Sequence, residues 1–289
     1  MTVRLFAAAA AAAVALSPLA AVAEVEHRPI EEKRLVSGKQ SLSPDKGYVY
    51  LHAPQRLAII LVKEPGEADR AAYEAEWREA LAEAKRRYPR KLEGWQRDVT
   101  WAKDHNMTPP DRPVEPTEQN FAIEPLERRM LISLGPQFIY ARQDEEFGYL
   151  HELEPGTYRY YGPVAAVQNG SYAGTCYCMG SVRFEVQPGK IANLGDFLTL
   201  GWATPEQGRL SALEWNRETP AQETDYALPA RLAAFPNAVA EWRAAGKIDN
   251  FYGVMVGRMP PVPGILAYQR DRVIDLTAAG APATGAGSR

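Results

Sequence analysis

Two cysteines, Cys176 and Cys178, are the residues of this chain whose type and spacing most directly suggest chemistry. Such a C-x-C pair could close a small disulfide, exchange electrons with other thiols, or bind a soft metal such as Cu(I) or Zn²⁺. In a regular strand, residues i and i+2 share a face, but their Cβ atoms lie further apart than the ~3.8 Å of a disulfide. Gly174 and Gly180 flank the pair and could supply the bend that is needed. We predict a local Cys176–Cys178 disulfide, with an intermolecular bridge, free thiols, redox exchange and metal binding as alternatives.

The histidines give little support to a metal site. None of the four has a metal-type spacing with the cysteines. We therefore predict no metal and no cofactor, and Cys176 and Cys178 remain the candidate ligands if a metal is bound. His151, beside Glu152, is predicted to be an exposed strand residue.

Hydrolase motifs are missing from the sequence, which has neither a G-x-S-x-G elbow nor H-E-x-x-H. Ser43-Pro44-Asp45-Lys46 matches S-x-x-K, but it lies in a turn before the first expected strand, so we interpret it as a chance match. A glycosidase would need two facing carboxylates. The acidic residues that could serve are Glu145, Glu146, Glu152, Glu154 and Glu185. The sequence favours a non-catalytic protein, with an envelope hydrolase as an alternative.

The first 23 residues have the layout of a secretory signal peptide. Arg4 precedes an Ala-rich apolar run at 5–16, and Ala21-Val22-Ala23 forms a small-x-small cleavage site before Glu24. No cysteine follows the run to carry a lipid anchor, and no later apolar run approaches the roughly 20 residues of a membrane span. We predict a secreted bacterial protein, periplasmic or extracellular, that starts near Glu24.

Charge and composition narrow the class of partner. Without the signal peptide, the chain keeps 32 basic and 36 acidic side chains, a net charge of −4, which argues against nucleic acid. The 46% of apolar residues indicates a folded protein.

Strand patterns dominate 47–202. The segment 47–63 predicts two strands, the second an unbroken apolar run of the kind that is covered on both faces. Later, Val182, Phe184 and Val186 alternate with Arg183 and Glu185, and turn signals recur every 8–12 residues, a pattern typical of a β-sandwich.

A helical insertion interrupts these strands at 67–106. Apolar and aromatic residues, Trp77, Tyr88 and Trp95 among them, recur at helical spacing on both sides of Pro89. This pattern predicts a helical hairpin, or one helix kinked at Pro89, followed by a Pro-rich linker at 108–116. The three aromatic residues are expected to pack in a core.

The end of the chain is predicted to form a small C-terminal α+β extension at 203–276. Leu232, Phe235, Val239 and Trp242 recur at helical spacing, and short strands are expected within 251–259 and 265–276. The tail at 277–289 consists largely of Ala, Gly, Thr and Ser and is predicted to be disordered.

Two motifs resemble the closing strands of prealbumin-like sandwiches. The segment 153–159 (LEPGTYR) carries a "PGTY" element, and 182–190 (VRFEVQPGK) carries "F-x-V-x-PGK". Carboxypeptidase-regulatory-like domains and related bacterial envelope modules have similar elements. The resemblance covers about a third of the chain and implies a fold, with no active site to carry over.

The combined interpretation is a mainly β protein: a β-sandwich at 47–202 with an inserted helical hairpin and a small C-terminal extension. We expect it to act as a non-catalytic binding or scaffolding module of the cell envelope, with an envelope protein or a glycan as partner. The first alternative is a thiol or metal-binding protein that uses the C-x-C pair. The second is the envelope hydrolase.

Overall fold

The structure, a computed structural model, describes residues 25–56, 58–143, 146–168, 170–199 and 223–278. The predicted signal peptide at 1–23, residues 203–222 of the predicted extension and nearly all of the tail at 277–289 lie outside the described residues. Of the described residues, Asp69–Ile123 form one unit, and the remainder form a second, mainly β unit.

The two strands expected at 47–63 are present as β2 (Gly47–Ala53) and β3 (Ile59–Lys63), and they enter different sheets. The first sheet has the strand order β1-β6-β2-β11-β12, with β5 also paired to β6. In it, β2 runs antiparallel to β6 and parallel to β11. The other strands of this sheet are β1 (His27–Ile30), β5 (Ala141–Gln143), β6 (Glu146–Leu153), β11 (Ile191–Gly195) and β12 (Asn237–Val239).

The second sheet has the order β13-β10-β7-β3-β4. Its strand β10 (Ser181–Val186) confirms the predicted alternation, because Val182, Phe184 and Val186 are buried while Glu185 is exposed. The remaining strands of this sheet are β4 (Leu131–Leu134), β7 (Gly156–Gly162) and β13 (Arg243–Ala245).

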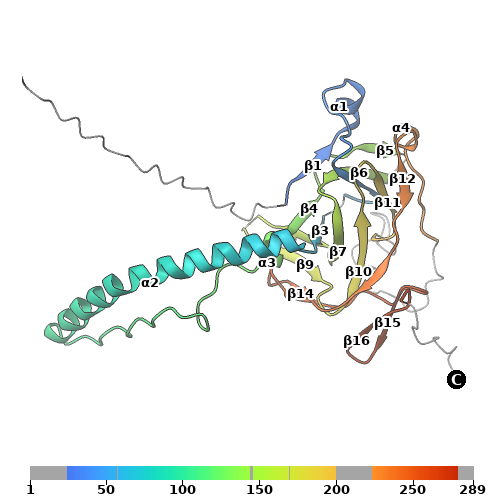
Figure 1. Cartoon of the computed structure of the whole chain (residues 1–289). Helices are drawn as coiled ribbons and strands as arrows, with labels where there is room; N and C mark the ends of the chain where they lie inside the picture. Colours follow the sequence, from blue (N-terminus) through green and yellow to red (C-terminus); the bar gives the residue numbers. More distant parts are fainter. Residues whose placement is uncertain (1–24, 57, 144–145, 169, 200–222, 279–289) are drawn as a thin grey trace, which may run out of the picture. The chain divides into compact units, whose positions relative to one another are not determined.

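Smaller elements complete the β unit (Figure 1). Strands β14 (Met255–Val256), β9 (Tyr172–Cys176) and β8 (Val164–Ala166) form a three-stranded sheet, and β15 (Leu266–Gln269) and β16 (Arg272–Asp275) form a hairpin. The short helices are α1 (Glu32–Val36), α3 (Leu126–Arg129) and α4 (Ala230–Ala233). None of the described helices is long and apolar enough to cross a membrane.

The first sheet is buried on both faces at its centre. Tyr48 and Tyr50 of β2 belong to a cluster of buried side chains that includes Leu150 and Leu232. Val49, which points to the opposite face because strand side chains alternate, is fully buried as well. On that side, a Cβ at Gly47 would collide with Val186 of β10, so the two large sheets approach each other there.

This arrangement confirms a mainly β fold. The packing of the two large sheets as a full sandwich stays a prediction, and so does the resemblance to prealbumin-like domains. The motif at 153–159 forms the turn from β6 into β7, and the motif at 182–190 forms β10 and the turn into β11.

Of the two forms predicted for the insertion, the helical hairpin is wrong, and the alternative of one helix agrees with the structure: α2 (Glu67–Asp104) is a single helix with Pro89 inside it. A proline inside a helix removes one backbone hydrogen bond and crowds the carbonyl of residue i−4, at a cost of about 3 kcal/mol. The helix nevertheless runs through Pro89, whose neighbours Tyr88 and Trp95 both bond to the segment that follows the helix. The Pro-rich stretch at 108–116 has no regular secondary structure.

The C-terminal region also differs from the prediction. Instead of a helix over 232–242, the chain forms one helical turn, α4, and then two strands that join the large sheets: β12 pairs with β11, and β13 pairs with β10. Pro236 explains the early end of the helix, since a residue before proline is disfavoured in helical geometry. The described part of the predicted extension, residues 223–276, therefore belongs to the β unit.

Candidate functional site

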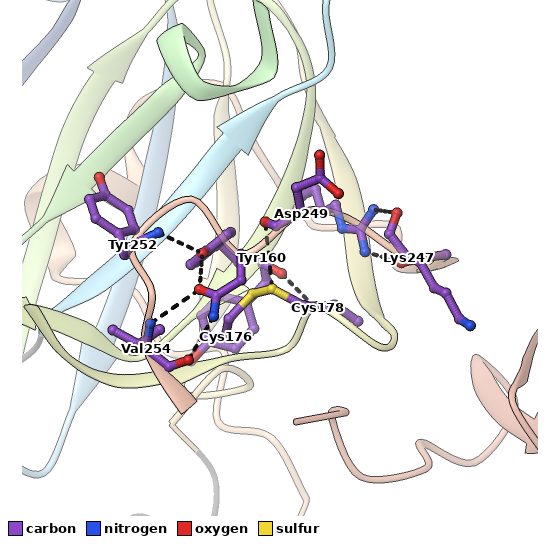
Figure 2. The surroundings of a disulfide bond; sticks show 12 residues. Tyr160, Cys176, Cys178, Lys247, Asp249, Tyr252 and Val254 are labelled. Carbon is purple, nitrogen blue, oxygen red and sulfur yellow. Dashed lines mark hydrogen bonds between the residues drawn. A yellow bond between two sulfur atoms is a disulfide. The ribbon is translucent and has the colours of Figure 1, made fainter. Parts of the chain in front are cut away.

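The structure joins Cys176 and Cys178 in a disulfide whose Cα atoms are 5.0 Å apart. Cys176 ends β9, and Cys178 precedes β10 (Figure 2). Gly174 and Gly180 have φ angles of 138° and 148°, in a region that residues with a side chain rarely adopt. The flanking glycines therefore supply the bend that the sequence suggested.

A covering segment (residues 246–257) lies over the cysteine pair. The backbone N–H of Ile248 donates to the carbonyl oxygen of Cys178 over 3.0 Å, and that of Gly257 donates to the carbonyl of Cys176 over 2.8 Å. The Cys178 sulfur lies 3.6 Å from the carbonyl oxygen of Asp249. Cys176 and Cys178 are 0% and 4% exposed, so a thiol or a metal ion from solution has no direct path to either sulfur. The geometry favours a structural bridge.

Arg159, a buried cation on β7, holds the beginning of the covering segment. Its Nη1 donates to the carbonyl of Lys247 over 3.1 Å, and its Nη2 donates to the carbonyl of Gly246. Burial lowers the pKa of Arg159 to about 10, which leaves the side chain charged near neutral pH. The guanidinium group of this arginine therefore binds backbone carbonyls of the covering segment and does not form an open site for an anion.

The prediction that His151 is exposed is wrong: the side chain is 3% exposed, and neither ring nitrogen has a hydrogen-bond partner among the described residues. His151 lies on β6 between Pro29 of β1 and Val49 of β2. At residue 151, β6 is paired with a strand on each edge, and its sheet is covered on both faces. The side chain of His151 is therefore buried whichever face of the sheet it points to. Burial, with a smaller contribution from His27, lowers the pKa of His151 to about 3.

A second histidine, His52, occupies a small polar hollow. Its Nδ1 lies 2.6 Å from Glu146 Oε2, and its Nε2 lies 3.0 Å from the carbonyl oxygen of Asp225. Nearby, burial raises the pKa of Asp196. The hollow measures about 30 Å³, and a second one beside β11 and β12 measures about 70 Å³. Both are far below the roughly 300–1,000 Å³ of a typical ligand pocket.

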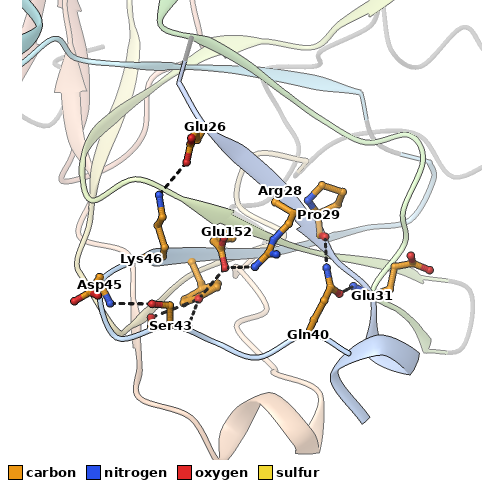
Figure 3. Close-up of polar contacts among 10 residues, drawn as sticks. Glu26, Arg28, Pro29, Glu31, Gln40, Ser43, Asp45, Lys46 and Glu152 are labelled. Carbon is orange, nitrogen blue, oxygen red and sulfur yellow. Dashed lines mark hydrogen bonds and ion pairs between the residues drawn. The ribbon is translucent and has the colours of Figure 1, made fainter. Parts of the chain in front are cut away.

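The S-x-x-K residues do not form a catalytic pair (Figure 3). The backbone N–H of Ser43 donates to the Tyr48 hydroxyl over 2.6 Å, and the Ser43 hydroxyl accepts from the N–H of Asp45. The Lys46 ammonium pairs with Glu26 over 3.2 Å. Ser43 thus stabilises a turn, and Lys46 forms an ion pair at the surface.

The candidate carboxylates are distributed among separate contacts. Glu152 accepts from Arg28 over 2.8 Å, Glu154 pairs with Lys63, and Glu146 faces His52. Glu185 is exposed on β10, and Glu145 lies outside the described residues. Within the described part of the chain, no group of three or more His, Cys, Asp or Glu side chains could hold a metal ion.

The aromatic residues of α2 bind the unit's own return segment (residues 105–123). Trp77 Nε1 donates to the carbonyl of Phe121 over 3.2 Å, the Tyr88 hydroxyl donates to Pro113 over 3.3 Å, and Trp95 Nε1 donates to Pro110 over 2.9 Å. The return segment therefore runs antiparallel to the helix. The expectation that these three side chains pack in a core is wrong: they bond to the return segment but stay partly exposed.

The sequence interpretation missed the charge of α2. Residues 85–91 (KRRYPRK) contain five basic side chains, and all five are exposed. The small net charge of the whole chain concealed this group, because acidic residues elsewhere cancel it in the sum. A local charge count along the predicted helix would have found it.

Comparison of the chain with protein-family models, with curated proteins and with solved structures gave no match.

Proposed function

We propose that this protein is an exported, non-catalytic binding or scaffolding module of the bacterial cell envelope. In it, the mainly β unit is the stable framework, and the helical unit, Asp69–Ile123, carries the surface for a partner. Export through a signal peptide at 1–23 and a periplasmic or extracellular location are part of this proposal.

The observation that carries the proposal is the exposure of α2. Within its 38 residues, only Leu81 and Ala102 are buried. A helix that is mostly polar is not held in place by a core, so a helix of this length needs another source of stability. The return segment supplies that source along one side, and the other side is left in contact with solvent. Long insertions of this kind add little to the entropic cost of folding and often carry function.

The cysteine pair fits the same proposal as a structural bridge. In an oxidising compartment, two neighbouring cysteines with suitable geometry form a disulfide. Its burial under residues 246–257 argues against thiol exchange or metal capture at Cys176 and Cys178. The separate contacts of the acidic side chains likewise give no support to the hydrolase alternative.

The test replaces 69–123 with a short Gly/Ser linker and compares this variant with the full chain in a bacterial host. We expect both proteins to reach the periplasm without residues 1–23, and the purified variant to unfold cooperatively at nearly the wild-type temperature. Chemical crosslinking in intact cells should give envelope adducts with the full chain that the variant does not form.

Two results would contradict the proposal. If the variant does not fold, the helical unit belongs to the structural core. If the variant forms the same adducts, the partner surface lies on the β unit. A cytoplasmic protein that keeps residues 1–23 would refute the export part alone.

A further inference from the structure

The middle of α2 has a strong local charge. Between Lys85 and Arg97 the helix has six basic side chains and one acidic one, Glu93. Glu83 forms ion pairs with Arg86 and Arg87. In the described part of the chain, no ion pair is formed by Lys85, Arg90, Lys91 or Arg97, and all four are exposed. Much of this positive charge is therefore not neutralised within the helical unit.

The charges have a definite place on the helix. Arg86, Arg90, Arg97 and Trp101 are separated by four, seven and four residues. At 3.6 residues per turn these spacings place the four side chains along one stripe. Trp77, Tyr88 and Trp95, which bind the return segment, project from the opposite side at the same periodicity. We call this stripe of three arginines and Trp101 the basic face; Arg87 flanks it, whereas Lys85 and Lys91 lie nearer the aromatic side.

The aromatic member of the basic face is unusually open to solvent. Trp101 is 54% exposed although its indole ring stacks on His105 at a centroid distance of 4.3 Å. Met107, just beyond the helix end, is 55% exposed. Its N–H donates to the carbonyl of Ala102 over 2.8 Å, which keeps it beside the last helical turn. Trp101 thus continues the row of arginines, and Met107 is a second exposed apolar side chain beyond the end of the helix.

We propose that the basic face binds the anionic phospholipid headgroups of a membrane surface, with α2 lying along that surface. This proposal rests on the proposed function, because it names the partner of the helical unit. Guanidinium groups form bidentate, charge-assisted hydrogen bonds with phosphate. From Arg86 to Trp101 the stripe extends about 22 Å along the helix, so several headgroups can be engaged together.

The exposed tryptophan favours a lipid surface over a soluble polyanion. Indole rings concentrate at the level of the headgroups, where one part of the ring is in an apolar environment and the other is hydrated. Clusters of basic residues on a helix are attracted to anionic membranes, by roughly a fivefold gain in binding per residue near the surface. A row of arginines that ends in Trp101 combines both features on one side of a helix.

The experiment measures co-sedimentation of the mature full chain with two kinds of vesicle: phosphatidylcholine alone, and phosphatidylcholine mixed with phosphatidylglycerol. We expect binding to the anionic vesicles that weakens as salt is added, because salt screens exposed charges. The double variant R90E/R97E should bind at least about 25-fold more weakly, since two attractive charges become repulsive. W101A should weaken binding while keeping its dependence on salt.

A matched control reverses two charges elsewhere. K39E/R272E changes the net charge by the same amount at two exposed residues of the β unit that form no ion pair in the described structure. It should bind the anionic vesicles as the wild type does. Circular dichroism of R90E/R97E establishes whether α2 is retained, and the more conservative R90Q/R97Q replaces it if helix is lost.

The proposal is overturned if the wild type ignores phosphatidylglycerol, or if the control loses as much binding as R90E/R97E. It is also overturned if a single-stranded oligonucleotide or inorganic polyphosphate binds through Arg90 and Arg97 while vesicles do not. Any of these three results leaves the proposed function standing if the crosslinked envelope adducts still depend on residues 69–123. Loss of those adducts from the wild type itself would instead count against the proposed function.

Discussion

Replacement of the buried His151 by leucine should change how the stability of the β unit depends on pH. The folded state holds the pKa of His151 at about 3, whereas an unfolded chain has the ordinary value of 6.5. Below pH 6.5 the unfolded chain binds a proton at His151, whereas the folded protein does not bind it until the pH is near 3. Protonation therefore favours unfolding. Above pH 6.5 His151 is neutral in both states and does not lower the free energy of unfolding. As the pH falls from 6.5 toward 3, proton binding to the unfolded state progressively lowers that free energy.

The size of this effect follows from the two pKa values. At about pH 4.5 the wild type should have lost roughly 3 kcal/mol through this single group, at about 1.4 kcal/mol per pH unit. H151L has no such proton to bind. Leucine also has no ring nitrogens, which in the wild type are buried without a hydrogen-bond partner among the described residues. Removal of such groups should make H151L as stable as the wild type, or more stable, near neutral pH.

The assay is urea unfolding of both proteins at about pH 7.5 and about pH 4.5. We expect the difference between their free energies of unfolding to shift by roughly 3 kcal/mol in favour of H151L at the lower pH. Contributions from other titrating groups are common to both proteins and cancel. A repeat at about pH 9 is the internal control, because His151 is neutral in both states there. If both proteins lose the same stability on acidification, then the folded protein accepts a proton at His151, and the burial argument is refuted.

Three further predictions concern single contacts. Trp95→Phe keeps an aromatic ring but removes the N–H that binds Pro110, so it should destabilise the helical unit by about 1 kcal/mol and speed proteolysis within 105–116. In native exported protein, Cys176 and Cys178 should resist alkylation, and mass spectrometry should find the chain two hydrogens lighter than its reduced form; bound metal or two reactive thiols would reverse this prediction. Gly174→Ala should destabilise the protein by about 2 kcal/mol or more, measured by thermal unfolding, because the new Cβ would collide with a backbone carbonyl at a φ of 138°.

Elements whose burial is decided locally could be predicted from the sequence. The alternation of β10 and the unbroken apolar run of β3 reflect the period of two and the double-sided burial of strands. The helical spacing around Trp77 and Trp95 likewise revealed α2. These patterns need no knowledge of distant residues, since each follows from which faces of one element meet water.

The C-terminal segment could not be predicted in this way. Leu232, Val239 and Trp242 recur at helical spacing, yet they have unrelated environments. Leu232 is buried in the cluster beneath the first sheet, Val239 is 50% exposed on β12, and the Trp242 ring stacks on Phe197 at 4.3 Å. The strand geometry there depends on the free edges of β10 and β11, which lie some fifty residues earlier in the chain.

The environment of His151 was likewise beyond a local pattern. A histidine beside a glutamate in a strand ordinarily indicates an exposed position. Here β1, from the beginning of the described chain, pairs with β6 and turns what would be an edge into an interior strand. Pairing between residues more than a hundred positions apart decides the burial, and the sequence near His151 contains no sign of it.

The division of α2 into two sides gives the functional proposals their common physical basis. A largely polar helix of this length gains little from a hydrophobic core, and it has a proline near its middle, so its stability must come from specific contacts. Trp77, Tyr88 and Trp95 provide them by packing on the return segment and donating hydrogen bonds to it. Those contacts occupy one side only, and on the opposite side Arg90 and Arg97 form no ion pair with any described residue. Charge reversal at Arg90 and Arg97 should therefore alter binding with little effect on folding, which separates a partner surface from a merely solvated helix.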